Sequence, residues 1–176
     1  MSVHICKGEA NNKIGFVLST PGKIESEAGC PAAGDTGDNM KAILEILNLI
    51  EPKIFPSTDR YHYLITNASI KVMYASKDKG KTEDTDSSII EQMNLDRIRR
   101  EITHCEILIL CGEKAHLLET HLSEKFIIKT PHLGNRGLRN RYKNDDPCLK
   151  GMGVAKDRDF VRWRLCAENI LEQLRT

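Results

Sequence analysis

The feature that most limits how this chain can fold is a set of short apolar runs: Ile14–Leu18, Ile107–Leu110 and Phe126–Thr130. Ile14–Leu18 and Ile107–Leu110 have no polar side chain, Phe126–Thr130 opens with three apolar residues, and segments with helical periodicity lie between the runs. Strands of this kind are buried on both faces, which is typical of parallel sheets covered by helices on each side. The sequence therefore predicts one α/β domain over residues 1–176. Its central, mostly parallel sheet should have about four strands, flanked by helices on both faces.

Further segments complete the predicted order of elements. Tyr61–Tyr74 is rich in β-branched and aromatic residues and predicts a strand that runs into a loop at Asn67. Residues 76–88 contain no apolar side chain and predict an exposed, mobile loop, and the basic segment 133–148 is expected to be irregular. Helices are expected from Asp38 to Ile50, from a Ser88–Glu91 capping box through Ile102, over Ala115–Leu122, and from about Asp157 to Leu174, with Phe160 on the buried face.

Composition argues against several classes of protein. Of the 176 residues, 40% are hydrophobic and 29% are charged, as in ordinary globular domains, and no apolar run is long enough to cross a membrane. The amino terminus, MSVHICKGEA, lacks the features of a signal peptide, so a cytoplasmic protein is expected. We also expect a monomer. The six cysteines form no C-x-x-C pair, which disfavours zinc and iron–sulfur sites. We therefore predict neither a metal nor a cofactor.

In a parallel α/β sheet, the functional site lies at the carboxyl ends of the strands. Three segments of this chain fall there: residues 19–37, Asn67 with its neighbours, and residues 131–142. This convergence follows from the periodicity of the chain, and it makes these segments the place to look for chemistry.

The first of these segments is a loop that combines glycines with acids. Gly29, Gly34 and Gly37 allow backbone N–H groups to approach a ligand, because glycine has no side chain in the way. Glu25 and Asp35 would lie near any anion bound there. The combination suits a site where a carboxylate works close to a nucleic-acid backbone, although an ordinary β-to-α loop can have the same composition.

The pattern P-G-x-x-E-x-x-x-G-x-P-x-x-G-x-x-G in this loop resembles the first motif of the uracil-DNA glycosylase superfamily, closest to its thermophile-type branches. Its fixed positions are Pro21, Gly22, Glu25, Gly29, Pro31, Gly34 and Gly37. The resemblance implies a monofunctional DNA glycosylase, which flips a pyrimidine and hydrolyses its N-glycosidic bond to leave an abasic site. Double-stranded or single-stranded DNA is the implied partner.

The other two segments resemble further motifs of the same superfamily. Asn67, which ends the sequence LITN, matches a strand-end asparagine that hydrogen-bonds a pyrimidine edge. His132 matches a histidine that stabilises negative charge growing on O2 of the departing base. The third match is partial, because Leu133 and Gly134 replace the usual Pro and Ser. A strand-capping asparagine and a surface histidine are the plainer alternatives.

The segment after His132 is basic and suits contact with DNA phosphates, although a solvated loop can have the same composition. Its cations are Arg136, Arg139, Arg141 and Lys143. Leu133 or Leu138 is the predicted apolar wedge, which would fill the gap left by a flipped nucleotide.

Two departures from the superfamily pattern affect the predicted chemistry. Ser19 and Thr20 stand where relatives carry the residue that handles the attacking water. One branch without that carboxylate carries G-D-x-x-G downstream, which Gly34-Asp35-Thr36-Gly37 resembles with one residue fewer before the last glycine. Asp35 is therefore the first candidate for holding water or stabilising an oxocarbenium-like sugar, and Glu25 is the second.

The other departure is Ala32, which replaces the aromatic residue beneath the flipped base. A methyl group in place of a ring removes the stacking platform and opens space. This favours a bulky modified pyrimidine of the phage type, and hence a role in phage defence, over plain uracil. A uracil repair glycosylase and a catalytically inactive DNA-binding module remain alternatives. A nucleotide hydrolase is disfavoured, because a mononucleotide needs fewer cations than the basic segment supplies.

Overall fold

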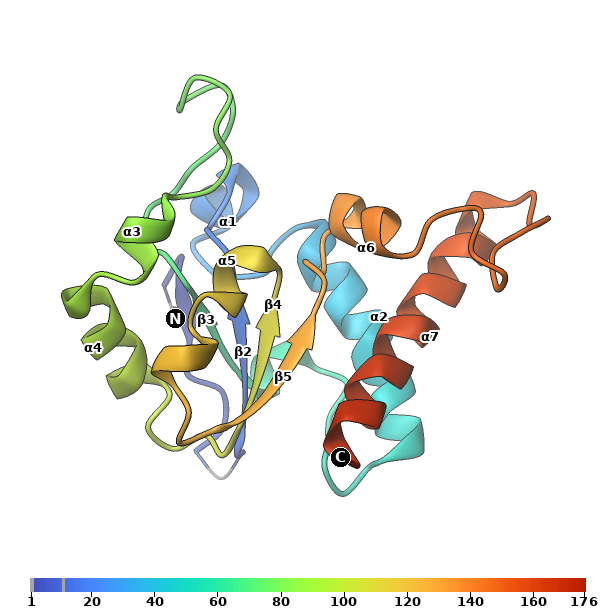
Figure 1. Ribbon diagram of the computed structural model, residues 1–176, viewed down its shortest axis with the longest axis horizontal. Coiled ribbons are helices and arrows are strands. Elements are labelled where there is room, and N and C mark those ends of the chain that lie inside the picture. Colours follow the sequence, from blue (N-terminus) through green and yellow to red (C-terminus); the bar gives the residue numbers. More distant parts are fainter. Residues whose placement is uncertain (1, 11) are drawn as a thin grey trace.

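Five strands form one sheet in the order β1-β3-β2-β4-β5 in the computed structural model, which describes residues 2–10 and 12–176 (Figure 1). The four strands β3, β2, β4 and β5 run parallel, and β1 pairs antiparallel with β3 at the edge of the sheet. Their bounds are β1 Ile5–Cys6, β2 Ile14–Leu18, β3 Leu64–Asn67, β4 Ile107–Cys111 and β5 Phe126–Thr130. The predicted α/β fold with a mostly parallel sheet is therefore confirmed, with one strand more than expected.

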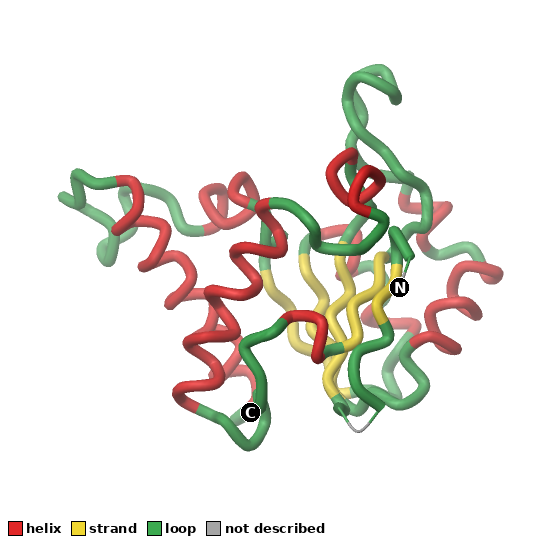
Figure 2. Tube along the Cα trace, turned by 180° about the vertical axis from the view of Figure 1, so that it is seen from behind, coloured by secondary structure: helices red, strands yellow, loops and turns green. Residues whose placement is uncertain are grey.

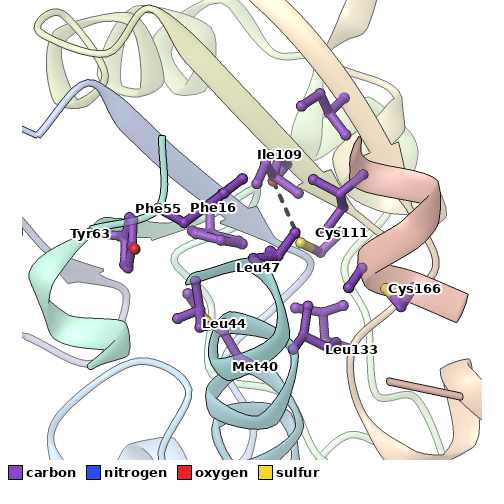
Figure 3. Packing of buried hydrophobic residues seen from close by; sticks show 14 of the residues in the cluster. Phe16, Met40, Leu44, Leu47, Phe55, Tyr63, Ile109, Cys111, Leu133 and Cys166 are labelled. Carbon is purple, nitrogen blue, oxygen red and sulfur yellow. Dashed lines mark hydrogen bonds between the residues drawn. The ribbon is translucent and has the colours of Figure 1, made fainter. Parts of the chain in front are cut away.

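Helices cover both faces of this sheet, because alternate strand residues point to opposite sides. The long helices α2 (Asp35–Ile50) and α7 (Ala155–Leu174) pack on the face that carries Phe16 and Ile109 (Figures 1 and 3). On the other face lie α3 (Asp86–Ile89), α4 (Gln92–Glu101), α5 (Glu113–His116) and the 3₁₀ turn η2 (Glu119–His121). Figure 2 shows the sheet from behind, enclosed between these two groups of helices.

Two short helices form in segments that were predicted to be loops. α1 (Lys23–Ala28) occupies the glycine-punctuated segment, and α6 (Asn135–Arg141) occupies the basic segment that was expected to be irregular. α6 forms because Leu138 packs into the core while the arginines on either side point outward, which is the pattern of one amphipathic turn. The helix expected from Asp38 begins earlier, at Asp35.

Other boundaries differ from the predictions for local reasons. The strand expected from Tyr61 begins later, at Leu64, because the Asp59 side chain accepts from the Tyr61 N–H and starts the 3₁₀ turn η1 (Arg60–His62); β3 ends at Asn67, where the loop was expected. The predicted Ser88–Glu91 capping box is wrong: Thr85 caps α3, and its side chain accepts from the Ser88 N–H.

The last helix also differs from the prediction. α7 starts two residues before Asp157, and Phe160, expected on its buried face, is 54% exposed. Neither α7 nor any other helix in residues 2–10 and 12–176 has the length and apolar character to span a bilayer.

Candidate functional site

A cleft of about 790 Å³ opens at the carboxyl end of the parallel strands, between segments that lie about a hundred residues apart in the sequence. One wall consists of α1 and the first turn of α2, and the other is the segment from His132 to Asn140, which includes α6. These are the first and third of the segments that the strand order was expected to bring together. Among the predicted site residues, the cleft is lined by Glu25, Asp35, His132, Arg136 and Arg139.

His132 follows directly after β5, and the backbone around it fixes its hydrogen bonding. The Gly134 N–H donates to His132 Nδ1 at 2.9 Å, so Nδ1 is the acceptor nitrogen of the ring. In the neutral imidazole the proton therefore sits on Nε2 and is free to be donated. Burial lowers the pKa of His132 below its usual value of 6.5, outweighing the nearby Glu83 and Glu25 carboxylates, which raise it. His132 is thus a neutral hydrogen-bond donor at neutral pH.

This electrostatic balance gives a direct prediction for Glu83. Replacing Glu83 with Gln removes a carboxylate that favours the charged imidazole, so the pKa of His132 should fall further. An NMR titration of the His132 ring measures this shift. Glu124→Gln, which changes an exposed residue before β5, is the matched control and should leave the midpoint unchanged. An unchanged midpoint in Glu83→Gln would show that Glu83 does not face His132.

Two glycines permit the close approach of backbone segments that builds this cleft. A Cβ at Gly137 would lie 2.1 Å from the His132 carbonyl oxygen, so α6 can fold against the His132 backbone only with glycine there. A Cβ at Gly37 would lie 1.8 Å from the Ala32 carbonyl oxygen, so the first turn of α2 packs directly on the preceding turn. The glycines of the first motif thus serve packing as well as access to the cleft.

The two candidate carboxylates in the cleft have different hydrogen bonds. Asp35 lies in the first turn of α2 but does not cap it; its Oδ2 accepts from Asn135 Nδ2 at 2.7 Å, across the cleft. Glu25 Oε2 accepts from the Gly22 N–H at 3.1 Å and so caps the start of α1. Asp35 is therefore held by a residue of the opposite wall, whereas Glu25 has a local structural role.

Two amide side chains, the buried Asn39 and the half-buried Asn135, support Asp35 from behind. Asn39, buried on α2, accepts from Trp163 Nε1 at 2.7 Å through its Oδ1. Its Nδ2 donates to the Leu133 carbonyl at 2.7 Å and to Asn135 Oδ1 at 3.0 Å, and Asn135 in turn donates to Asp35. One side chain of α2 therefore fixes both the loop after His132 and the partner of Asp35.

Removing this amide should destabilise the protein. Asn39→Ala leaves the Trp163 N–H and the Leu133 carbonyl without their partner, which costs about 1–3 kcal/mol for each buried group that stays unpaired. Urea unfolding measures the loss. Lys41→Ala, an exposed change on the same helix, is the control and should stay within about 0.5 kcal/mol of the wild type. A loss no greater than that of the control would contradict the supporting role of Asn39.

The second predicted segment does not reach the cleft. Asn67 is buried at the end of β3, and its Oδ1 has no hydrogen-bond partner within the described residues. Its expected contact with a pyrimidine edge stays a prediction. Ser19 and Thr20 also lie away from the cleft lining: Ser19 Oγ donates to the Cys111 carbonyl at 3.5 Å, and Thr20 Oγ1 accepts from the Asp84 N–H at 3.4 Å.

Ala32 does not line the cleft. Its side chain is fully buried in the apolar core, and its φ of 53° is in the left-handed region. Its small side chain therefore does not enlarge this cleft. A phenylalanine there would overfill the core and strain the backbone, with no ring delivered to the cleft.

The predicted wedge residues are also wrong, because both leucines belong to the core. Leu133 is 1% exposed and Leu138 is 2% exposed, and Figure 3 shows Leu133 among the apolar side chains over α2. A buried side chain cannot enter a base stack. The exposed apolar residue of the cleft is Ile24, on α1, with 52% of its surface open to solvent.

The four predicted phosphate contacts divide into two groups. Arg136 lines the cleft and makes no ion pair with the described residues, whereas Arg139 pairs with Asp159 at 3.2 Å. Arg141 and Lys143 are exposed but do not line the cleft. Arg141 lies 5.9 Å from the centre of the Tyr142 ring.

Sequence reasoning missed Asn135, Asn39, Glu83 and Ile24. A signal existed for Asn39, since it is a polar residue on the otherwise apolar face of α2 that includes Met40 and Ile43. No signal of that kind marks Glu83, whose proximity to His132 depends on how a long loop folds back. Compared with known proteins, the sequence matches no protein-family model and no curated protein.

Proposed function

We propose that this protein is a monofunctional DNA glycosylase, a divergent relative of the uracil-DNA glycosylase superfamily. One observation carries the proposal: His132, a neutral donor, and Asp35, a carboxylate held from the opposite wall, border the same cleft beside Arg136. Residues from two of the three segments that carry the sequence resemblance thus lie together, whereas Asn67 lies outside the cleft lining. A hydrolase that breaks a base–sugar bond needs both kinds of group there.

In the proposed reaction, the flipped nucleotide enters the cleft and the bond between C1′ and the base nitrogen breaks. The electron pair moves onto the base, where the His132 Nε2–H stabilises the negative charge that develops on O2. Asp35 stabilises the positive charge on the sugar and orients a water for attack at C1′. The water oxygen bonds to C1′, and its proton passes to Asp35 or to solvent. The products are a free base and an abasic site.

The basic wall of the cleft supports DNA as the substrate. Arg136 and Arg139 line this wall, while Arg141, at the end of α6, and Lys143, two residues after it, lie outside the cleft lining. Cations in such a row suit contacts along a phosphate backbone, which position the duplex without reading its sequence. In this proposal, Ile24 takes the wedge role that Leu133 and Leu138 cannot fill.

We propose a class of substrate base and not one particular base. The cleft, at about 790 Å³, lies in the upper part of the range of ligand pockets, roughly 300–1,000 Å³. By size, a pyrimidine bulkier than uracil fits, such as the modified bases of phage DNA. The volume of the cleft supports a bulky base; Ala32 does not, because it lies outside the cleft lining.

The proposal is tested with duplex oligonucleotides that carry uracil or a bulky modified pyrimidine, followed by alkaline cleavage at abasic sites. We expect strand breaks at the modified position with the wild type and far fewer with His132→Ala. DNA binding without strand breaks on any substrate would favour the inactive binding module. Release of base from free nucleotides but not from DNA would favour a nucleotide hydrolase.

A further inference from the structure

The segment between β3 and α3 projects from the same end of the molecule as the cleft. We call residues 70–85 the lysine loop; it rises above the carboxyl end of the sheet beside α1, in both views (Figures 1 and 2). Its composition predicts a mobile, solvated loop, yet it has an ordered framework of hydrogen bonds.

The base of the lysine loop is fastened to the rim of the cleft. Asp84 is buried and accepts from Ser69 Oγ at 2.8 Å and Lys71 Nζ at 2.9 Å. The Asp84 N–H donates to Thr20 Oγ1 at 3.4 Å. The Met73 N–H donates to the Pro21 carbonyl at 2.9 Å, and Pro21 directly precedes the residues that line the cleft. The loop therefore has a fixed position relative to the proposed active site.

Hydrogen bonds near the tip of the loop hold Asp78 against the backbone, while Lys79 and Lys81 stay exposed. Asp78 Oδ2 accepts from the Tyr74 N–H at 2.9 Å, and the Gly80 N–H donates to the Ala75 carbonyl at 2.9 Å. Lys79 and Gly80 both have positive φ, at 51° and 86°, which closes the tip as a tight turn. Lys79 and Lys81 are exposed and make no ion pair with any residue in the described part of the chain.

We propose that the lysine loop is a second phosphate-binding arm, which holds DNA on the α1 side of the cleft while α6 holds it on the other. The inference rests on the proposed function. A duplex with one nucleotide in the cleft extends beyond it in both directions, and α6 provides cations on one side only. Lys79 and Lys81 provide them on the other, from a loop whose base is fixed at Thr20 and Pro21.

The test compares Lys79→Gln/Lys81→Gln with the wild type in DNA binding over a range of salt concentrations. Each lost phosphate contact lowers the slope of log K against log salt by about 0.9, so the double variant should lose about 1.8. The matched control is Lys13→Gln/Lys53→Gln, two exposed lysines by the amino-terminal end of β2, which should bind like the wild type. Thermal unfolding checks that both variants are folded.

The outcomes separate this inference from the proposed function. If the salt slope of Lys79→Gln/Lys81→Gln is unchanged and the wild type releases base, the lysine loop does not bind phosphates, and the glycosylase proposal still stands. If the slope falls in the double variant but the wild type releases no base, the lysine loop binds phosphates and the protein is not a glycosylase. A fall of equal size in the Lys13→Gln/Lys53→Gln control would show only a general charge effect and would also overturn the arm.

Discussion

His132→Ala is expected to lower the rate of base release by about 10²–10³-fold, the usual effect of removing a donor aimed at developing charge. The reason lies in its surroundings: the Gly134 N–H occupies Nδ1, and burial holds the pKa of the ring below its usual range. The Nε2–H is therefore available in the neutral ring at neutral pH. Single-turnover kinetics on a modified oligonucleotide measure the loss.

Measuring the affinity for DNA shows whether a loss of base release comes from lost chemistry or from a misfolded protein. His132→Ala should bind the oligonucleotide about as well as the wild type, because the proposed phosphate contacts lie on α6 and the lysine loop. His116→Ala changes another half-buried histidine, whose Nε2 lies 2.9 Å from the Thr130 carbonyl and which does not line the cleft. It is expected to retain the wild-type rate where the protein stays folded. Full turnover by His132→Ala would remove the histidine from the mechanism.

Asp35→Asn should have the second large effect, a loss of about 100-fold or more in base release. Asparagine keeps the size of the side chain but removes the charge that would stabilise the sugar cation and orient water. Asp38→Asn is a close control, since Asp38 lies in the same first turn of α2, is exposed, and does not line the cleft. That variant should keep the wild-type rate.

The competing carboxylate gives this experiment a clear alternative. Glu25→Gln should lose less activity than Asp35→Asn, because the Glu25 carboxylate already caps α1 through the Gly22 N–H. If Glu25→Gln proves the more damaging change, Glu25 is the residue that handles water and Asp35 only orders Asn135.

The parts of the fold that could be predicted are those determined by local patterns. β2 and β4 are apolar runs buried almost throughout, as expected of strands between two layers of helices, whereas β5 is apolar only over its first three residues. The carboxyl ends of these parallel strands share one edge of the sheet, and Asp35 and His132 border one cleft there. The edge strand β1, at Ile5–Cys6, is too short to leave such a pattern.

The sequence does not show in which direction a single side chain points, and several predictions about the site differ from the structure for this reason. Leu133 and Leu138 match an expected role by position, but the turn into α6 points both into the core. Ala32 is a similar case: its backbone is left-handed and its methyl group is buried in the core. Residues 76–83 were expected to be exposed because they carry no apolar side chain, and all of them but Asp78 are; the hydrogen bonds of the buried Asp84 at the base of the loop could not be predicted from composition.

The most direct test of the central claim is mass spectrometry of the small molecules released from DNA by the wild-type protein, using genomic DNAs that differ in their modified pyrimidines. A glycosylase releases a free base from at least one of them and leaves an abasic site for each base. With the same DNA, His132→Ala and Asp35→Asn should release little of it, while Asp38→Asn matches the wild type. Equal release by the wild type and His132→Ala, or no release from any of the DNAs, would contradict the assignment of this cleft as a base-excision site.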